Sequence, residues 1–170
     1  MKDMAFSYPD ATFDDLDQRA VEKLIFEQSE GQFILKAHVF IERLLDTAIQ
    51  RGVRRPECLN AADRLSFDLK VDLARALGVL PERMVSAIQA LNGLRNRVVH
   101  TDDFRPSLAE LRRLRLDWHP MQAKAFDAAR AKSLEEAERI ACLFLTWRCI
   151  HLVASPQVRG KTKTNPKDKG

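Results

Sequence analysis

The sequence predicts one all-α domain, an up-and-down bundle of six or seven helices over residues 12–154, followed by a basic tail over residues 155–170. Apolar residues recur at helical spacing along most of the chain. No segment shows the sustained alternation of a β-strand or an Asn-Gly hairpin signal. The 170 residues, 45% of them hydrophobic, are enough for one domain with a continuous core.

The expected helices begin and end at local signals. Thr12-x-x-Asp15 and Ser133-x-x-Glu136 have the pattern of capping boxes, in which the first side chain accepts a backbone N–H of the opening turn. Gly52 suits a helix end, and Pro81 suits the first turn of a helix. The predicted helices span about residues 12–30, 32–51, 59–77, 81–100, 107–116, 120–132 and 133–154.

The formal net charge of +4 comes from one segment. Residues 155–170 hold five bases and one acid, so the rest of the chain sums to zero. The tail is too polar to bury itself, and we expect it to be disordered. Within the neutral body, residues 1–30 carry three bases against eight acids, whereas residues 105–132 carry seven bases against three acids. This polarity is compatible with one basic face.

The spacing of the cysteines and the lack of a long apolar run indicate a cytoplasmic protein. Cys142 and Cys149 are seven positions apart on one expected helix, a separation of about 10 Å that excludes a disulfide between them. No cysteine stands in a zinc-ligand spacing, so Cys58 and the other two are expected to be small hydrophobes, with no metal or cofactor. We also expect no membrane partner, because no apolar run approaches the roughly 18 to 20 residues that span a bilayer.

The expected helix over residues 81–100 contains the most informative pattern. On a helical wheel its apolar residues share an arc of about 180°, and Arg95 falls near the middle of that arc. A guanidinium among apolar side chains is costly unless something compensates its charge. A column of polar residues runs along the edge of the same arc: Asn92, Asn96 and His100. Around the helix axis, His100 is about 140° from Arg95.

Arg95, Asn96 and His100 are therefore the candidate catalytic residues. An arginine can hold a phosphate or its transition-state charge, and an imidazole, with a pKa of about 6.5, can transfer a proton near neutral pH. These groups suffice for RNA cleavage through attack of the 2′-hydroxyl without a metal.

Arg95-Asn96-x-x-x-His100 resembles the R-x4-6-H motif of the HEPN superfamily. The run from Leu65 to Pro81, with Leu69-Lys70 and Leu77-Gly78-Val79-Leu80-Pro81, is similar to the mannitol-operon repressor family, and Ile41-Glu42-Arg43-Leu44-Leu45 fits the preceding helix of such proteins. The resemblance covers roughly residues 31–104.

The HEPN resemblance implies a HEPN-like bundle and a homodimer in which both arginines and both histidines line one cleft. Arg95 would then stabilise phosphate charge, Asn96 would orient the site and His100 would act as general acid or base. The implied activity is a metal-independent endoribonuclease, a toxin or defence effector with RNA as substrate and an antitoxin or regulatory protein as partner.

Two alternatives remain open. The repressor-like similarity implies a non-catalytic regulator that binds a protein partner through the same surface. In the other alternative, Arg95 forms a buried ion pair with an acid such as Glu42, and His100 caps its helix.

Further residues qualify for supporting roles. His38 and Glu42 are i, i+4 neighbours on the rim of their helix and could face the motif helix as a proton-handling pair. A basic stretch could bind an RNA backbone or form a solvated face; its arginines are Arg112, Arg113 and Arg115. His119 is expected to be a turn element.

Overall fold

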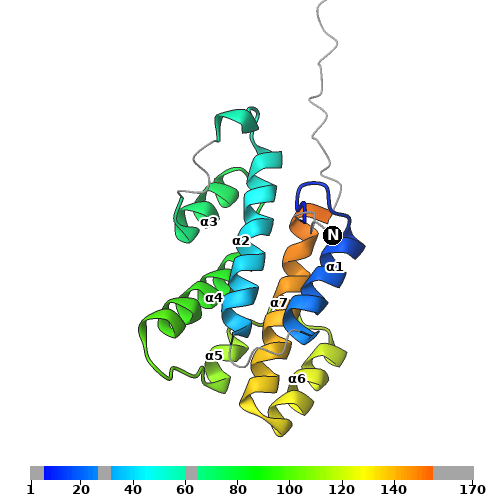
Figure 1. The fold of residues 1–170 in the computed structure, drawn as a ribbon, viewed down its shortest axis with the longest axis vertical. Coiled ribbons are helices and arrows are strands. Elements are labelled where there is room, and N and C mark those ends of the chain that lie inside the picture. The colour runs from blue at the N-terminus through cyan, green and yellow to red at the C-terminus, as the bar shows by residue number, and fades with distance from the viewer. Residues whose placement is uncertain (1–5, 27–31, 60–64, 155–170) are drawn as a thin grey trace, which may run out of the picture.

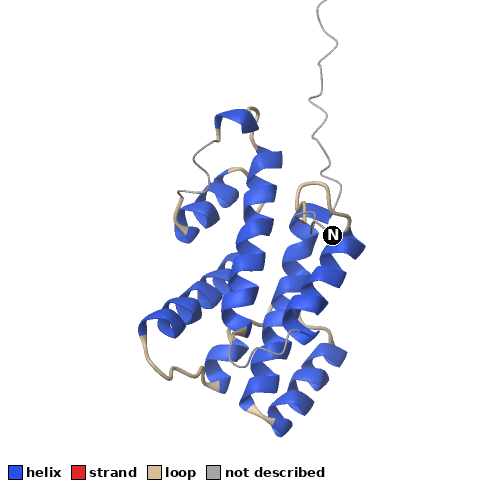
Figure 2. Cartoon of the chain, viewed as in Figure 1, coloured by secondary structure: helices blue, strands red, loops and turns tan. Residues whose placement is uncertain are grey.

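The computed structural model describes residues 6–26, 32–59 and 65–154. Within these ranges the chain forms seven α-helices and no strand (Figures 1 and 2), so the predicted all-α class is confirmed. The helices are α1 (Phe13–Val21), α2 (Phe33–Gly52), α3 (Phe67–Ala76), α4 (Glu82–His100), α5 (Leu108–Arg112), α6 (Pro120–Lys132) and α7 (Leu134–Ala154), with a π-helical turn η1 (Glu22–Phe26) and a 3-10 turn η2 (Pro56–Cys58).

Helices α2 and α7 form the centre of the bundle and pack against each other more extensively than any other pair. Helices α1 and α6 pack on α7, whereas α3 and α4 pack on α2 (Figure 1). Both central helices are apolar over most of their surface, because they are covered from several sides. Among the described residues, no helix is both long and apolar enough to cross a membrane.

Helix ends follow the local signals in most places. The predicted capping box at Thr12 is present, with Asp15 accepting from the Thr12 backbone N–H at 2.9 Å. Ser133 Oγ accepts the Glu136 backbone N–H at 3.0 Å and so caps α7. Gly78, with φ of +70°, occupies the left-handed region just after α3, where a residue without a Cβ avoids strain.

The structure differs from the sequence predictions at the start of one helix and at one cysteine. The predicted start of the third helix near Leu59 is wrong, because α3 begins after Ser66, whose hydroxyl accepts the Leu69 N–H at 3.3 Å. Of the three cysteines expected to be small hydrophobes, Cys58 is exposed, whereas Cys142 and Cys149 are buried. The ends proposed for the first helix and the tail, residues 27–30 and 155–170, lie outside the described residues.

Candidate functional site

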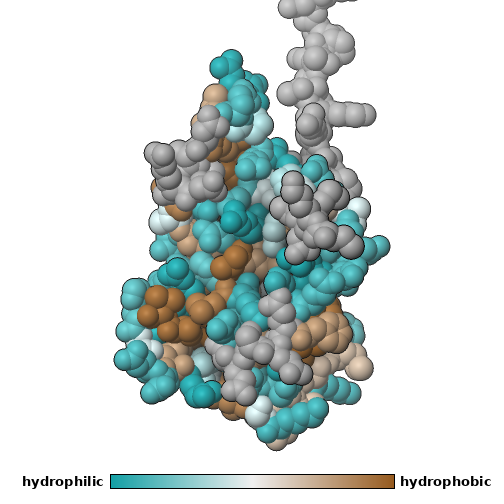
Figure 3. All heavy atoms as spheres, in the orientation of Figure 1, coloured by the Kyte–Doolittle hydropathy of each residue, from teal (hydrophilic) through white to brown (hydrophobic). Residues whose placement is uncertain are grey.

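Arg95 lies in the C-terminal half of α4 and is half-buried. The apolar side chains predicted around Arg95 are not all buried. Val99, one turn later in the predicted apolar arc, is 51% exposed. Figure 3 shows apolar side chains gathered on the surface where α4 lies, at the left of the view. The apolar arc is therefore buried in the first part of α4 and open to solvent at its end.

Asn96 is the recorded hydrogen-bond partner of Arg95. Nη1 of Arg95 donates to Oδ1 of Asn96 at 3.0 Å, a contact between neighbours that fixes the guanidinium without neutralising it. The predicted role of Asn96 as the residue that orients Arg95 is compatible with this contact.

His100 is the last residue of α4 and is exposed. Five positions on a helix correspond to a rotation of about 140°, so Arg95 and His100 leave α4 in different directions. One chain does not bring these two candidate groups together.

Asn92 connects α4 to the two neighbouring helices through a buried chain of hydrogen bonds. Its Nδ2 donates to Oδ1 of Asp68 at 2.9 Å, which leaves its Oδ1 to accept from Nε2 of His38 at 3.1 Å. The carboxylate of Asp68 can only accept, so this arrangement places the proton of a neutral His38 ring on Nε2. Helices α2, α3 and α4 are thereby joined at one point.

His38 itself is 4% exposed, so its predicted position on the rim of α2 is wrong. Its ring lies 4.3 Å from that of Phe67, centroid to centroid. Burial lowers the pKa of His38, and the nearby positive charge of Arg95 lowers it as well, against the opposing influence of Asn92 and Glu42. A neutral imidazole is the form that this site favours.

Glu42 does not pair with His38 or with Arg95. Its Oε1 lies 2.8 Å from Nζ of Lys70, and the same ammonium group lies 2.9 Å from Oδ1 of Asp46. Lys70 is buried on the inner face of α3. Burial alone would lower the pKa of Lys70, but the hydrogen bonds to both carboxylates outweigh burial and raise it. The sequence interpretation missed this cluster, although Lys70 shares a helix face with Phe67, at i+3, which is a usable signal.

These contacts decide the charge of the region around Arg95. The carboxylates of Glu42 and Asp46 are engaged by Lys70, and that of Asp68 accepts from Asn92. Within the described ranges, no carboxylate lies within ion-pair distance of the Arg95 guanidinium. The alternative in which Arg95 forms a buried ion pair with Glu42 is therefore not realised.

The basic residues expected to contact RNA lie at and beyond α5, and all three are exposed: Arg112, Arg113 and Arg115. Their surroundings differ, since Arg115 lies over the ring of Trp118, at 5.7 Å from its centroid, while Arg113 lines a hollow between α4 and α5. His119 caps α6, its Nδ1 accepting the Met121 N–H at 3.3 Å, as expected of a turn element.

No family model, curated protein or solved structure matches the chain.

Proposed function

We propose that this chain is a HEPN-like, metal-independent endoribonuclease, and that Arg95 and His100 meet in a cleft shared by two copies of the chain. The observation that carries the proposal is the charge of Arg95. Its recorded partner is the neutral amide of Asn96, while the acids of the neighbouring helices bind Lys70 and Asn92. A half-buried guanidinium with a neutral partner retains its charge for a phosphate.

The directions of the two side chains favour a second copy. Arg95 and His100 diverge by about 140° around α4, so a partner helix is needed to set one chain's histidine beside the other chain's arginine. The end of α4 is suited to burial, because Val99 is 51% exposed there, and the neighbouring helices α2 and α3 expose Val39 and Leu69 at 55% and 50%. A twofold axis near Val99 would bury that side chain and unite the polar groups.

The proposed reaction uses proton transfer alone. The imidazole of His100 accepts the proton of the RNA 2′-hydroxyl as its oxygen attacks the adjacent phosphorus, and the P–O5′ bond breaks as the departing oxygen takes a proton from water, whose hydroxide then returns the imidazolium to its neutral form. The products are a 2′,3′-cyclic phosphate and a 5′-hydroxyl. Arg95, held by Asn96, stabilises the extra negative charge on the phosphoryl oxygens in the transition state.

The test incubates the purified chain with single-stranded RNA in the presence of EDTA. We expect cleavage by the wild-type chain and a loss of about 100-fold to 10,000-fold in Arg95→Ala and in His100→Ala. Matched controls are Arg83→Ala, at an exposed arginine of α4, and His151→Ala, at an exposed histidine of α7. Equal survival of RNA with the wild-type chain and both site variants would refute the proposal.

A mixing experiment tests the shared cleft. If each of two sites takes its arginine from one copy and its histidine from the other, mixing Arg95→Ala with His100→Ala leaves about a quarter of all sites intact after subunit exchange. We expect activity to return to roughly that fraction of wild type, together with a dimer mass by light scattering. A mixture as inactive as its components would contradict the shared cleft.

A non-catalytic regulator is the second candidate, favoured by the same three exposed apolar side chains. A protein that docks on them would leave the chain monomeric in isolation and inactive on RNA. The mass measurement and the cleavage assay therefore separate the two functions.

A further inference from the structure

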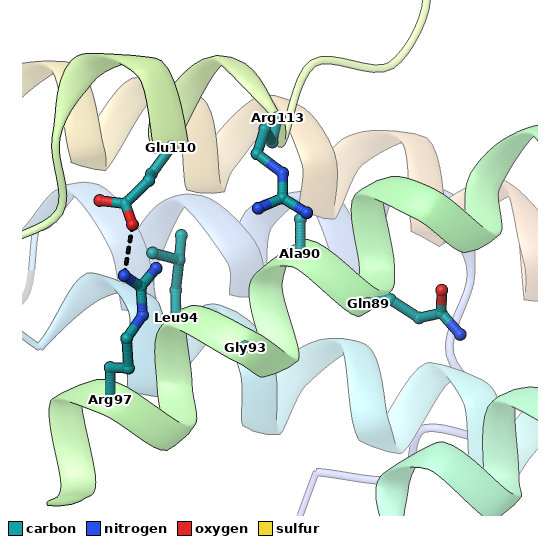
Figure 4. A pocket seen from close by; sticks show the side chains of 7 residues that line it. All are labelled: Gln89, Ala90, Gly93, Leu94, Arg97, Glu110 and Arg113. Carbon is teal, nitrogen blue, oxygen red and sulfur yellow. Dashed lines mark ion pairs between the residues drawn. The ribbon is translucent and has the colours of Figure 1, made fainter.

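A hollow of about 290 Å³ lies between α4 and α5, on the side of α4 away from Arg95. Arg97 and Gly93 line it from α4, Glu110 lines it from α5 and Arg113 from the C-cap of α5, and Ala90 and Leu94 form its apolar wall (Figure 4).

Arg97 is held in place by two contacts. It forms an ion pair with Glu110, drawn as the dashed line in Figure 4, and its guanidinium lies over the ring of Phe104, 4.6 Å from the centroid. Glu110 accepts the backbone N–H of Ser107 at 2.8 Å and closes a capping box at the start of α5. The Ser107 backbone and the Arg97 side chain lower the pKa of Glu110 to about 2, so the carboxylate stays ionised and the pair is neutral at physiological pH.

Arg113 is the charge that this pair does not balance. Its side chain extends from the C-cap of α5 toward α4 in Figure 4, and it lines the hollow together with Ala90. Arg113 forms no ion pair with any residue in the described ranges. With two arginines and one glutamate, the hollow carries a net positive charge, which favours an anion.

Gly93 keeps the hollow open. A glycine inside a helix costs about 1 kcal/mol relative to alanine. Nothing around Gly93 requires it, because a Cβ added there would meet no atom within 4 Å, and its φ is not in the left-handed region. The missing side chain instead leaves space beside Arg97 and Arg113. A substrate that enters between the two helices would use this space.

We propose that this hollow binds a phosphate of the RNA strand, next to the phosphate that is cleaved at His100. Arg97 precedes His100 by three positions, so both side chains leave the same exposed face of α4, about 4.5 Å apart along its axis. A strand that crosses His100 therefore passes the hollow. Arg113 binds the phosphate directly, and Arg97 supplies the opposite wall. This inference rests on the proposed function, because it needs RNA at His100.

The experiment measures binding of a labelled single-stranded RNA in the His100→Ala background, where the proposed cleavage cannot deplete the ligand. We expect Arg113→Gln to weaken binding about 10-fold and to reduce the slope of log affinity against log salt by about 0.7. The matched control is Arg55→Gln, an exposed arginine next to η2 at the opposite end of the molecule (Figure 1), for which we expect less than a 2-fold change. All variants contain the same basic tail, so its contribution cancels.

Two further variants change the hollow in opposite ways. Glu110→Gln retains a capping side chain but removes the negative charge, so RNA should bind about 3-fold to 10-fold more tightly. Gly93→Gln fills the hollow without strain and should weaken binding as much as Arg113→Gln does.

The outcomes separate this inference from the proposed function. Equal affinities for Arg113→Gln and Arg55→Gln, in a chain that binds and cleaves RNA, would overturn the phosphate site and leave the nuclease proposal intact. Tighter binding with Glu110→Gln and weaker binding with Gly93→Gln would support the site. A wild-type chain that neither binds nor cleaves RNA would overturn both proposals.

Discussion

Replacing Lys70 tests how the polar interior beside Arg95 is held together. The Lys70 side chain is 3% exposed, and it contacts the carboxylates of Glu42 and Asp46, which are 30% and 11% exposed. Lys70→Met retains an apolar stem of similar length and removes only the positive charge. Two neighbouring carboxylates of α2 would then lie at the contact with α3 without a cation.

The expected loss of stability follows from this burial. Breaking a buried ion pair typically costs 3 to 5 kcal/mol, because the remaining charge is left without a partner. We expect about 3 kcal/mol for Lys70→Met, near the lower limit, since water reaches part of Glu42 and screens its charge. Adding Asp46→Asn to this variant should recover about 1 to 2 kcal/mol, whereas Asp46→Asn alone should destabilise the wild-type chain.

Urea unfolding followed by circular dichroism at pH 7 measures these differences. The control on the same helix is Arg75→Met, which removes a salt bridge to Glu82. The side chains of Arg75 and Glu82 are 39% and 74% exposed, so this change should cost less than about 1 kcal/mol. A loss for Lys70→Met no larger than that for Arg75→Met would refute the reasoning.

The pH dependence gives an independent check. Burial raises the pKa of Asp46 against the opposing influence of Lys70, and removing the ammonium group should raise that pKa further. An aspartate whose folded-state pKa is raised destabilises the fold above that pKa and ceases to do so when it is protonated. The stability gap between Lys70→Met and wild type should therefore shrink as pH falls from 7 toward 5, and a constant gap would contradict this assignment.

Two other predictions follow from burial. Because burial lowers the pKa of His38, the unfolded chain takes up a proton below about pH 6.5 that the folded chain resists, so His38 contributes stability at neutral pH that is lost as pH falls through its folded-state pKa. His38→Gln, which keeps a donor for Asn92, should flatten the decline in unfolding free energy between pH 7.5 and 5.5; an unchanged slope would contradict the assignment. Thiol titration of the native chain should modify Cys58 alone, since Cys142 and Cys149 are fully buried and burial raises the pKa of both thiols; all three should react in denaturant, and rapid modification of a second native thiol would count against the packing of α7.

The helices of the bundle could be predicted because caps and apolar periodicity are signals between residues close together in the sequence. The start of α1 follows from Thr12 and Asp15, and the central helices follow from apolar periodicity. The start of α3 was misplaced because apolar periodicity does not mark a helix end, whereas the Ser66 cap determines where the helix begins.

The candidate site was less predictable because its contacts are tertiary. His38 and Asn92 are 54 positions apart and Asn92 and Asp68 are 24 apart, so no spacing along one helix relates them. The helical wheel of α4 placed Arg95 among apolar residues, but it could not indicate which of these residues neighbouring helices bury. Val99 belongs to the same apolar arc and is exposed. Glu42 is not available to pair with Arg95 because it binds Lys70, a residue of another helix.

The hydrogen bonds of Asn92 anchor α4 at that residue, so the part of the helix beyond it can tilt as a rigid segment. Beyond that anchor, eight residues carry the helix about 12 Å to His100, and a tilt of only 5° at the anchor would move its tip by about 1 Å. The ion pair between Arg97 and Glu110 restrains that motion, and half-exposed ion pairs weaken as salt rises. A displacement of about 1 Å can cost a catalyst 100-fold in rate, so the proposed cleavage at His100 should be sensitive to ionic strength even at saturating concentrations of RNA.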